Sequence, residues 1–397
     1  MWHPTIVSTL DGRVAGIVDA HAHFFNPRTP PWSLQRLGRA SVPVLRALPA
    51  PLVRVAGRFT DEHSLSGLAG PGLLNKRYEL REYGKDLAGL CTAAGVTVES
   101  VIPVDSQWRR RLSPDEAAAA VRRDIEQLAS LPYGNGLPAL GGLLVPADER
   151  VPGLGVRESL DRDELGLIRG VRLRWGRHPD HLVHDWSSEP GALSSPNFLR
   201  TFPSLADRGL IFESLCYSHE LGELAAFASE YPEVDIVVEH LGLPVGVFGP
   251  VGSSTGTTAA ARADILSLWR ERMSMLAARP NVSVKISGIA SGLLGYGRER
   301  SGNIGGQHIL ADMIGPLVLH VTDRFGPERV LFGSNAPLDS HNATIGVTVG
   351  ALVDVLSDRG DHLLSRLFAG NARRLYRIAD QPPASGEADS ESVDAGD

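Results

Sequence analysis

The sequence of 397 residues predicts an α/β protein built as a (β/α)8 TIM barrel, with a long insertion after the first strand and a disordered acidic tail. The first observation is that short apolar, β-branched segments alternate with amphipathic segments of helical period, which is typical of a parallel sheet covered by helices. The second is that eight such strands can be counted, and eight βα units suggest a closed barrel. The third is a chain length sufficient for one elaborated barrel domain with a large core.

The predicted strands and helices follow one another in the order that a barrel requires. The strands are residues 17–23, 98–104, 140–145, 170–174, 210–215, 234–240, 282–287 and 330–334. Helical stretches between them include 114–131, 218–231, 261–278 and 307–325. Because the catalytic residues of such barrels lie at the C-terminal ends of the strands, these ends are where the chemistry is expected.

Three connections at that end of the barrel are long. Residues 24–77 are rich in Pro, Arg and Leu and far exceed a usual βα loop, so they are expected to cover the mouth as a lid. The stretches 246–258 and 288–306 are glycine-rich, which predicts flexibility. The last stretch, 379–397, is small, acidic and proline-containing, which predicts disorder and leaves residues 1–378 as a single domain.

Composition and charge indicate a globular protein whose body carries little net charge. Hydrophobic residues make up 43% and charged residues 21% of the chain, which is ordinary for such a protein. The formal net charge is -7, and the acidic tail supplies most of it, so the body of the chain is nearly neutral. Phosphate contacts need clustered Lys and Arg side chains, so nucleic acid is not expected as a partner.

Cysteine usage and the N-terminal sequence favour the cytoplasm. Cys91 and Cys216 are too few and too far apart to predict a disulfide framework or a cysteine zinc site. Residues 1–16 have neither a basic start nor an apolar core, and no apolar run approaches the length of a membrane span. We therefore expect no membrane partner, and a homo-oligomer stays open.

The first strand ends in the most informative motif of the chain. Residues 17–23 read Ile-Val-Asp-Ala-His-Ala-His. Strict alternation in a strand places Asp19, His21 and His23 on one face. Two neutral imidazoles side by side can chelate one divalent ion. A half-buried strand with two hydrogen-bonded histidines is the alternative interpretation.

Two further strand ends contribute polar residues to the same edge of the barrel. The sixth strand ends in Glu-His-Leu-Gly, which places His240 level with His21 and His23. The eighth strand continues into Phe-Gly-Ser-Asn-Ala-Pro-Leu-Asp, which ends at Asp339. Three imidazoles are therefore expected to converge beside this segment.

Together these motifs resemble the amidohydrolase superfamily. The resemblance is carried by the His-x-His strand, the His-Leu-Gly strand, Val-Lys-Ile-Ser-Gly in the seventh strand, the Phe-Gly-Ser-Asn-x-Pro-x-Asp segment and the sequence from Phe368 to Tyr376. The chain is most similar to the amidohydrolase-related branch, which includes sugar-lactone and pyrone-dicarboxylate lactonases. The resemblance covers residues 17–378 and implies a (β/α)8 barrel that cleaves esters, lactones or amides with an activated water. Some members of the superfamily decarboxylate, hydrate or isomerise instead.

One departure from the family pattern concerns the general base. Asn335 stands where most superfamily hydrolases have an aspartate, and an amide cannot accept the proton of an attacking water. A general base contributes a factor of about 100 to 10,000 in rate. Asp339, four residues further on, is the expected replacement, and Asn335 is expected to orient the water or stabilise the oxyanion.

A second departure concerns the metal. Arg172 and Leu173 stand where binuclear members have a bridging lysine or glutamate, and Glu213 stands where many members have histidine, which disfavours a binuclear centre. The resemblance therefore implies one zinc or manganese ion held by the three histidines His21, His23 and His240, with Asp339 or Glu213 completing the shell. Some lactonases of this branch work without metal, in which case the histidines bind substrate oxygens directly.

Other polar residues of the strands are candidates for substrate binding. Arg172 and Arg174 share a face of the fourth strand and could bind a substrate carboxylate, or form ion pairs in the barrel wall. Lys285 could bind substrate or pair with Glu213.

Asp105 and Trp108 follow the second strand. Their segment resembles the branch's Val-Glu-Ala-x-Trp, which implies a place in the pocket lining. The histidines that follow the fourth strand, His178, His181 and His184, are interpreted as surface residues.

The leading hypothesis is a hydrolase that adds water to a lactone or related cyclic ester or amide of a small carboxylated molecule. In it, His21, His23 and His240 hold the metal, Asp339 takes the proton and Arg174 fixes the substrate. Two rival hypotheses keep the barrel: a lyase, decarboxylase or cyclase whose lid excludes water, and a catalytically silent barrel that binds a ligand.

Overall fold

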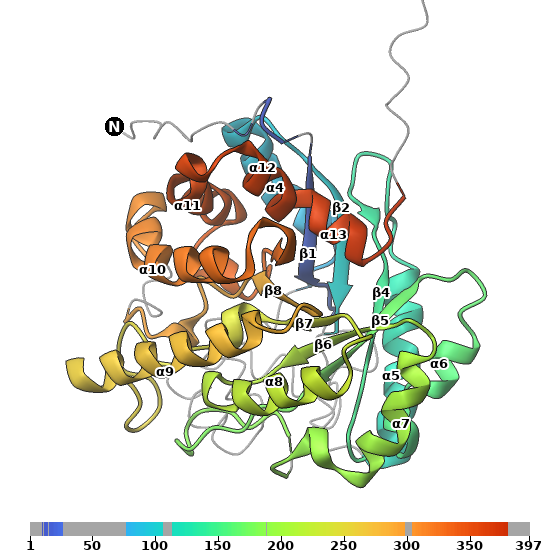
Figure 1. Ribbon diagram of the computed structural model, residues 1–397. Coiled ribbons are helices and arrows are strands. Elements are labelled where there is room, and N and C mark those ends of the chain that lie inside the picture. Colours follow the sequence, from blue (N-terminus) through green and yellow to red (C-terminus); the bar gives the residue numbers. More distant parts are fainter. Residues whose placement is uncertain are drawn as a thin grey trace, which may run out of the picture.

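The computed structural model describes residues 10, 12–14, 16–26, 77–105, 113–187, 189–297 and 304–379. Its strands surround one axis and its helices lie outside them (Figure 1). The strands are β1 (Ile17–His23), β2 (Val98–Val104), β3 (Ala139–Leu140), β4 (Leu143–Pro146), β5 (Ile168–Arg174), β6 (Ile211–Leu215), β7 (Ile236–Val238), β8 (Val282–Ile286) and β9 (Val330–Phe332). The predicted barrel is confirmed, and the predicted third strand is divided into β3 and β4.

All strand pairs are parallel, in the order β1-β2-β3 in one sheet and β4 to β9 in sequence in the other. Gly141 and Gly142 form the corner between the two sheets, and Gly142 has a φ of +152°, which glycine adopts readily. On the opposite side, a parallel bridge between Ala22 and Ala336 joins β1 to the segment after β9. The cylinder thus closes at the end of β1, where the His-x-His motif lies.

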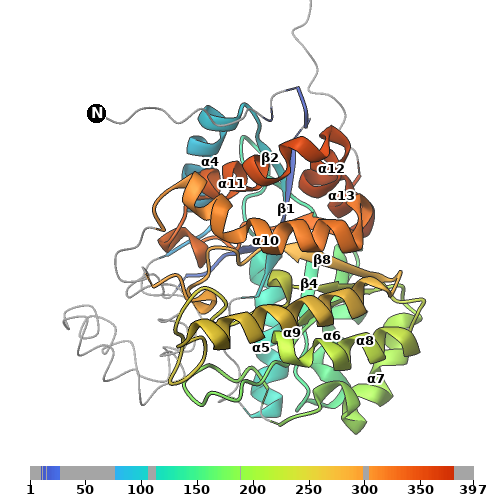
Figure 2. The same cartoon turned by 60° about the vertical axis from the view of Figure 1, so that its left-hand side comes forward.

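The helices form a layer around the strands. The longer ones are α4 (Leu80–Ala94), α5 (Pro114–Ala129), α7 (Pro196–Ala206), α8 (Leu221–Glu230), α9 (Ala259–Ala277), α10 (Gln307–Phe325) and α11 (Ile345–Leu356). Helices α9 and α10 lie side by side on one flank (Figure 2). Helix α5 begins where the sequence predicts, because Ser113 and Glu116 form a capping box and Pro114 occupies the first turn.

The inside of the barrel is apolar at its base and polar above it. The base contains Val18, Ala20, Leu331 and Tyr376, which belong to one buried cluster. Tyr376 directly follows the C-terminal helix α13 (Asn371–Leu375), which packs against β1 and β9. Buried polar side chains therefore gather toward the C-terminal ends of the strands.

The prediction that Asp19 shares a face with His21 and His23 is wrong. The pairing of β1 with β2 is irregular between Asp19 and Ala22, and such an irregularity breaks strict alternation. The Asp19 carboxylate instead accepts hydrogen bonds from the Tyr83 hydroxyl of α4, at 2.6 Å, and from the backbone N–H groups of His21 and Ser334. Asp19 therefore ties β1 to α4 and to the end of β9.

The glycine-rich stretch 246–258 is held by contacts that the prediction of flexibility did not include. The Asp180 carboxylate accepts hydrogen bonds from the backbone N–H groups of Ser253, Ser254 and Thr255. The N–H groups of Gly246 and Phe248 bond to carbonyl oxygens of the loop after β8, at 2.9 Å each. The loops after β5, β7 and β8 are thus joined.

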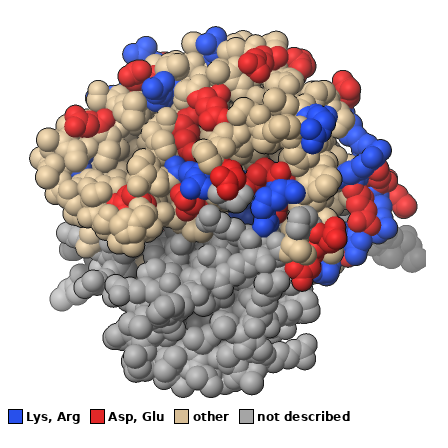
Figure 3. All heavy atoms as spheres, turned by 90° about the horizontal axis from the view of Figure 1, so that it is seen from below, with Lys and Arg blue, Asp and Glu red and all other residues tan. Residues whose placement is uncertain are grey.

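Several predictions fall on residues outside those described. They are the body of the expected lid (27–76), the pocket residue Trp108 and the acidic tail from 380 onward. Among the helices of the described residues, none combines the length and apolar content that a membrane span requires. On the face shown in Figure 3, the described acidic and basic side chains are interspersed.

The hydrogen bond between Tyr83 and Asp19 yields a stability prediction. Tyr83→Phe keeps the buried ring but leaves a buried carboxylate oxygen without its hydroxyl donor, so we expect a loss of about 1–3 kcal/mol in the free energy of unfolding. Tyr231→Phe is the matched control, because the Tyr231 hydroxyl makes no hydrogen bond among the described residues, and its effect should stay within about 0.5 kcal/mol. Denaturant unfolding of both variants measures the difference, and equal values would contradict the structural role of Asp19.

Candidate active site

The structure brings the three predicted imidazoles together around His21. The ring centroid of His21 lies 5.0 Å from that of His23 and 4.5 Å from that of His240. His21 and His23 come from the end of β1, and His240 follows β7. All three side chains are buried. The convergence expected at the C-terminal end of the barrel is therefore present.

Each histidine ring is held by a particular partner. His23 Nδ1 lies 3.2 Å from the backbone carbonyl oxygen of Asp105, which can only accept, so this nitrogen carries the proton. The Nε2 atoms of His21 and His23 face each other at 3.3 Å. His240 Nδ1 lies 2.8 Å from the Ser287 hydroxyl. The Nε2 atom of His23 is therefore the nitrogen with the lone pair.

The three imidazoles are neutral near pH 7. Burial lowers the pKa of His21 well below its usual value, and nearby His240 and Lys285 lower it further. Burial likewise lowers the pKa of His23 to about 3 and that of His240 to about 4. Neutral imidazole is the form that binds metal ions or accepts hydrogen bonds.

A buried ion-pair network lies directly beside the histidines. Arg172 donates to both carboxylate oxygens of Glu239, at 2.7 Å each, and to Asp105 at 2.8 Å. Arg174 donates to the other oxygen of Asp105, at 2.8 Å. Burial alone would raise the pKa of Glu239, but the charge and hydrogen bonds of Arg172 hold it below its usual value. Glu239 is thus an anion, and Arg172 takes the ion-pair position that was one of the two predicted alternatives.

A second ion pair lies deeper in the barrel. Lys285 donates to Glu213 at 2.6 Å, and the Tyr376 hydroxyl donates to the other oxygen of Glu213 at 2.5 Å. Burial raises the pKa of Glu213 to about 7, although Lys285 opposes the shift. The pairing of Lys285 with Glu213 is the alternative that the sequence left open. Their roles as substrate contacts stay predictions.

Asn335 and Asp339 form a hydrogen-bonded pair after β9. The Asn335 amide group donates to Asp339 Oδ1 at 2.7 Å, and the Ala290 N–H donates to Oδ2 at 2.9 Å. Asn335 also joins the histidine strand, because its backbone N–H donates to the His21 carbonyl at 2.8 Å. The amide oxygen of Asn335 is buried without a hydrogen-bond partner among the described residues. The pair thus presents a carboxylate and an unused acceptor near β1.

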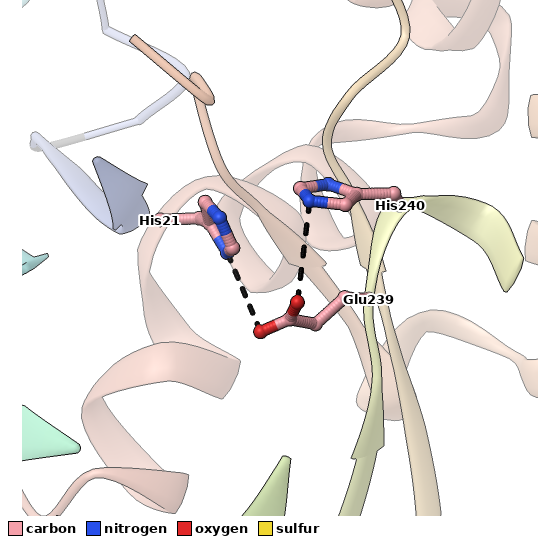
Figure 4. Close-up of side chains that lie close together, drawn as sticks. All are labelled: His21, Glu239 and His240. Carbon is pink, nitrogen blue, oxygen red and sulfur yellow. Dashed lines mark ion pairs between the residues drawn. The ribbon is translucent and has the colours of Figure 1, made fainter. Parts of the chain in front are cut away.

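The donor atoms fit a divalent metal ion. His21, Glu239 and His240 each offer one donor atom, and these atoms all lie within 4.8 Å of one another (Figure 4). His21 Nδ1 is buried without a hydrogen-bond partner, 3.7 Å from Glu239. His23 is not a member of this group of three. Its Nε2 atom faces the Nε2 atom of His21 at 3.3 Å, and His21 Nδ1 is the nitrogen that faces Glu239. Nitrogen donors with a carboxylate suit zinc or manganese.

Sequence reasoning missed Glu239 and Ser287 as members of this site. Glu239 immediately precedes His240, and strict strand alternation would turn the two side chains to opposite faces. The chain leaves the strand at this point, and His240 has a φ of +51°. Glu239 and His240 can therefore face the same site, and the alternation pattern of a strand does not predict this arrangement.

The histidines of the loop after β5 differ among themselves. His181 is exposed, as expected for a surface residue. His178 is half-buried, and its ring lies 5.1 Å from that of Tyr217 and 5.7 Å from that of His219. The His184 ring contacts Trp186, which also lies under the guanidinium of Arg174. His178 and His184 are thus half-buried, in contrast to the exposed surface position predicted for them.

Comparison with known proteins finds a family match over most of the chain. A family model described as Amidohydrolase matches residues 18–378. The uncharacterized protein y4mH of Sinorhizobium fredii is 30% identical over 246 residues, which cover 60% of this chain and 70% of that protein. The L-fucono-1,5-lactonase of Burkholderia ambifaria is 33% identical over 229 residues, which cover 56% of this chain and 65% of that enzyme. The match thus spans slightly less than two thirds of the lactonase.

A solved structure shares the fold. The crystal structure of an amidohydrolase from Burkholderia multivorans with bound zinc superposes with a TM-score of 0.60 at 20% identity, covering 92% of this chain and 100% of that one. Such a low identity supports the fold alone. With the family match from residue 18 to residue 378, the chain belongs to the amidohydrolase family, in the branch that contains lactonases.

Proposed function

We propose that this protein is a metal-dependent hydrolase that opens a lactone, or a related cyclic ester or amide, of a small carboxylated molecule. The observation that carries the proposal is the group of neutral, buried imidazoles beside Glu239 at the C-terminal end of the barrel. The relationship to a lactonase supports the choice of substrate class. The free thiols Cys91 and Cys216 are consistent with a cytoplasmic location.

The proposed metal-holding residues are His21, His23 and His240. Glu239 is added to them as a proposed ligand because it lies beside His21 and His240. When bound, zinc or manganese would polarise the substrate carbonyl and make water more acidic. The chain contributes the conditions for binding, because burial keeps the imidazoles neutral and Arg172 keeps Glu239 ionised. Each carboxylate oxygen has two lone pairs, so the hydrogen bonds from Arg172 leave Glu239 further acceptor capacity.

Asp339 is the proposed general base. Burial raises the pKa of Asp339 to about 7, although hydrogen bonds from Ala290 and Asn335 oppose the shift. A base of this pKa is matched to proton transfer near neutral pH. The hydrogen bond from the Asn335 amide to Asp339 fixes the orientation of the amide. The unpartnered Asn335 oxygen then accepts a hydrogen bond from the attacking water.

Arg174 is the proposed contact for the substrate carboxylate. Its side chain is 17% exposed, whereas that of Arg172 is 3% exposed. Asp105 fixes one end of the Arg174 guanidinium, and the Trp186 ring supports it at 5.8 Å. An arginine held in this way can bind a carboxylate with two parallel hydrogen bonds. Trp108 keeps its predicted place in the pocket lining.

The proposal predicts incorporation of solvent oxygen into the product. The zinc- or manganese-loaded protein should open at least one carboxylated lactone, and in H2¹⁸O one labelled oxygen should appear in the new carboxylate. Mass spectrometry of the product detects the label. Release of CO2 or cyclisation without label would instead establish the lyase alternative. A protein that neither turns over lactones nor retains metal would be the silent barrel.

Replacement of the proposed base should remove most of the activity. Asp339→Asn keeps the size of the side chain but cannot accept a proton, so kcat should fall by a factor of about 100 to 10,000. The Asp339 carboxylate must be ionised to act, and burial raises its pKa to about 7. The kcat/KM of the wild type should therefore decline below about pH 7. Rate measurements from acid to alkaline pH should show this limb in the wild type and its loss in the variant.

Asn342→Ala is the control for a purely structural role of Asp339. The Asn342 side chain donates to the Ala290 carbonyl at 2.7 Å and so supports the same loop that Asp339 binds. This variant should retain the acid limb and most of kcat. If it loses as much activity as Asp339→Asn, Asp339 supports the loop and is not the base.

Removal of the Arg174 charge should affect carboxylated substrates selectively. Arg174→Met should raise KM for a carboxylated lactone about tenfold or more, the value of a charge-assisted hydrogen bond, and should change KM for an uncharged lactone little. Arg177→Met is the matched control, because the Arg177 guanidinium binds Asp185 and the Ser187 carbonyl. Steady-state kinetics with the two substrates tests the assignment. An equal increase for both lactones would contradict it.

A further inference from the structure

The His240 ring lies against residues at the end of the neighbouring strand β8. His240 follows β7 in a left-handed conformation, with φ of +51°, and Leu241 follows with φ of +56°. Such conformations are costly for residues other than glycine and persist where the surroundings determine them. The surroundings of the ring come from the end of β8, at Ser287 and Gly288.

Ser287 and Gly288 pack closely against this ring. The Ser287 hydroxyl lies 2.8 Å from His240 Nδ1, and Ser287 is fully buried. Gly288 has a φ of +63°, and a Cβ atom there would lie 2.8 Å from His240 Cγ and Nδ1. A larger residue at 288 would therefore displace the imidazole.

Similar close packing involves His21, through Gly333. A Cβ atom at Gly333 would lie 2.7 Å from the Cβ of His21 and 3.1 Å from the Cβ of Ser287. Ser287 thus lies beside Gly333, which packs against His21, and its own side chain contacts His240. The contact with His240 is made by the Ser287 hydroxyl.

We propose that Ser287 is a positioning residue that fixes the tautomer of His240. The Ser287 hydroxyl accepts a hydrogen bond from Nδ1–H, so that Nε2 keeps its lone pair on the side of Glu239, whose Oε2 lies 4.0 Å away. A histidine that binds metal commonly donates its other ring N–H to an oxygen, which sets its tautomer and orientation. The inference rests on the proposed metal-holding role of His240.

The alternative, in which the Ser287 hydroxyl donates to Nδ1, would place the ring proton on Nε2, on the side of Glu239.

The tautomer can be read directly in the metal-free protein. Long-range ¹H–¹⁵N correlation spectra of histidine-labelled protein should show His240 as the neutral Nδ1–H form, with His240→Asn used to assign its signals. In Ser287→Ala the Nε2–H form should appear alongside it. A wild-type ring protonated on Nε2, or a tautomer that Ser287→Ala does not change, would overturn the proposal. A wild-type ring protonated on Nε2 overturns the proposal even if the variant fails to fold.

Metal affinity provides a second readout. Ser287→Ala should weaken zinc binding about 10- to 100-fold in competition with a chromogenic chelator. Ser283→Ala is the matched control, because Ser283 is also buried on β8 and lies on the same face as Lys285 by strand alternation. It should leave the affinity unchanged, and equal losses in both variants would contradict a specific role for Ser287.

The two proposals can fail separately. A protein with the predicted tautomer and Ser287-dependent zinc binding, but without lactone turnover, would retain this inference and reject the proposed hydrolase. Turnover with a Ser287-independent tautomer would do the reverse.

Discussion

The bidentate ion pair between Arg172 and Glu239 is the interaction on which the site depends. Both side chains are buried, and the pair joins β5 to the residue that follows β7. Burying two charges costs several kcal/mol per ion, and only close geometry with further hydrogen bonds offsets that cost. Asp105 completes the arrangement, because it accepts from both Arg172 and Arg174. Loss of one partner would leave an uncompensated charge inside the barrel.

The same network determines the chemistry of the histidines. Arg172 and Lys285 are cations close to the imidazoles, and both lower the pKa of His21 and His240 in addition to burial. The charges that hold the strands together therefore also keep the proposed ligands neutral. The apolar base formed with Tyr376 confines this polar region to the C-terminal ends of the strands. Structural and functional roles of the charged residues are thus not separable here.

The pair of Asn335 and Asp339 shows how one family pattern can be rearranged. The amide cannot serve as a base, but it orders the carboxylate four residues away and keeps its own oxygen unpartnered. The segment remains attached to β1 through the hydrogen bond from the Asn335 backbone to His21. A buried carboxylate therefore lies on the loop that closes the barrel beside the histidine strand.

The sequence by itself determined the barrel and the edge where the histidines meet. Strand and helix periods are local properties, and the C-terminal ends of parallel strands share one edge, so His21, His23 and His240 could be placed without coordinates. Only the tertiary structure decided which polar residues face one another. Asp19 turns to α4 because the pairing of β1 is irregular, and Glu239 joins His240 because the chain leaves the strand between them. The partners of Asp180 lie 73 to 75 residues further along the chain, and no local pattern records a contact that packing alone creates.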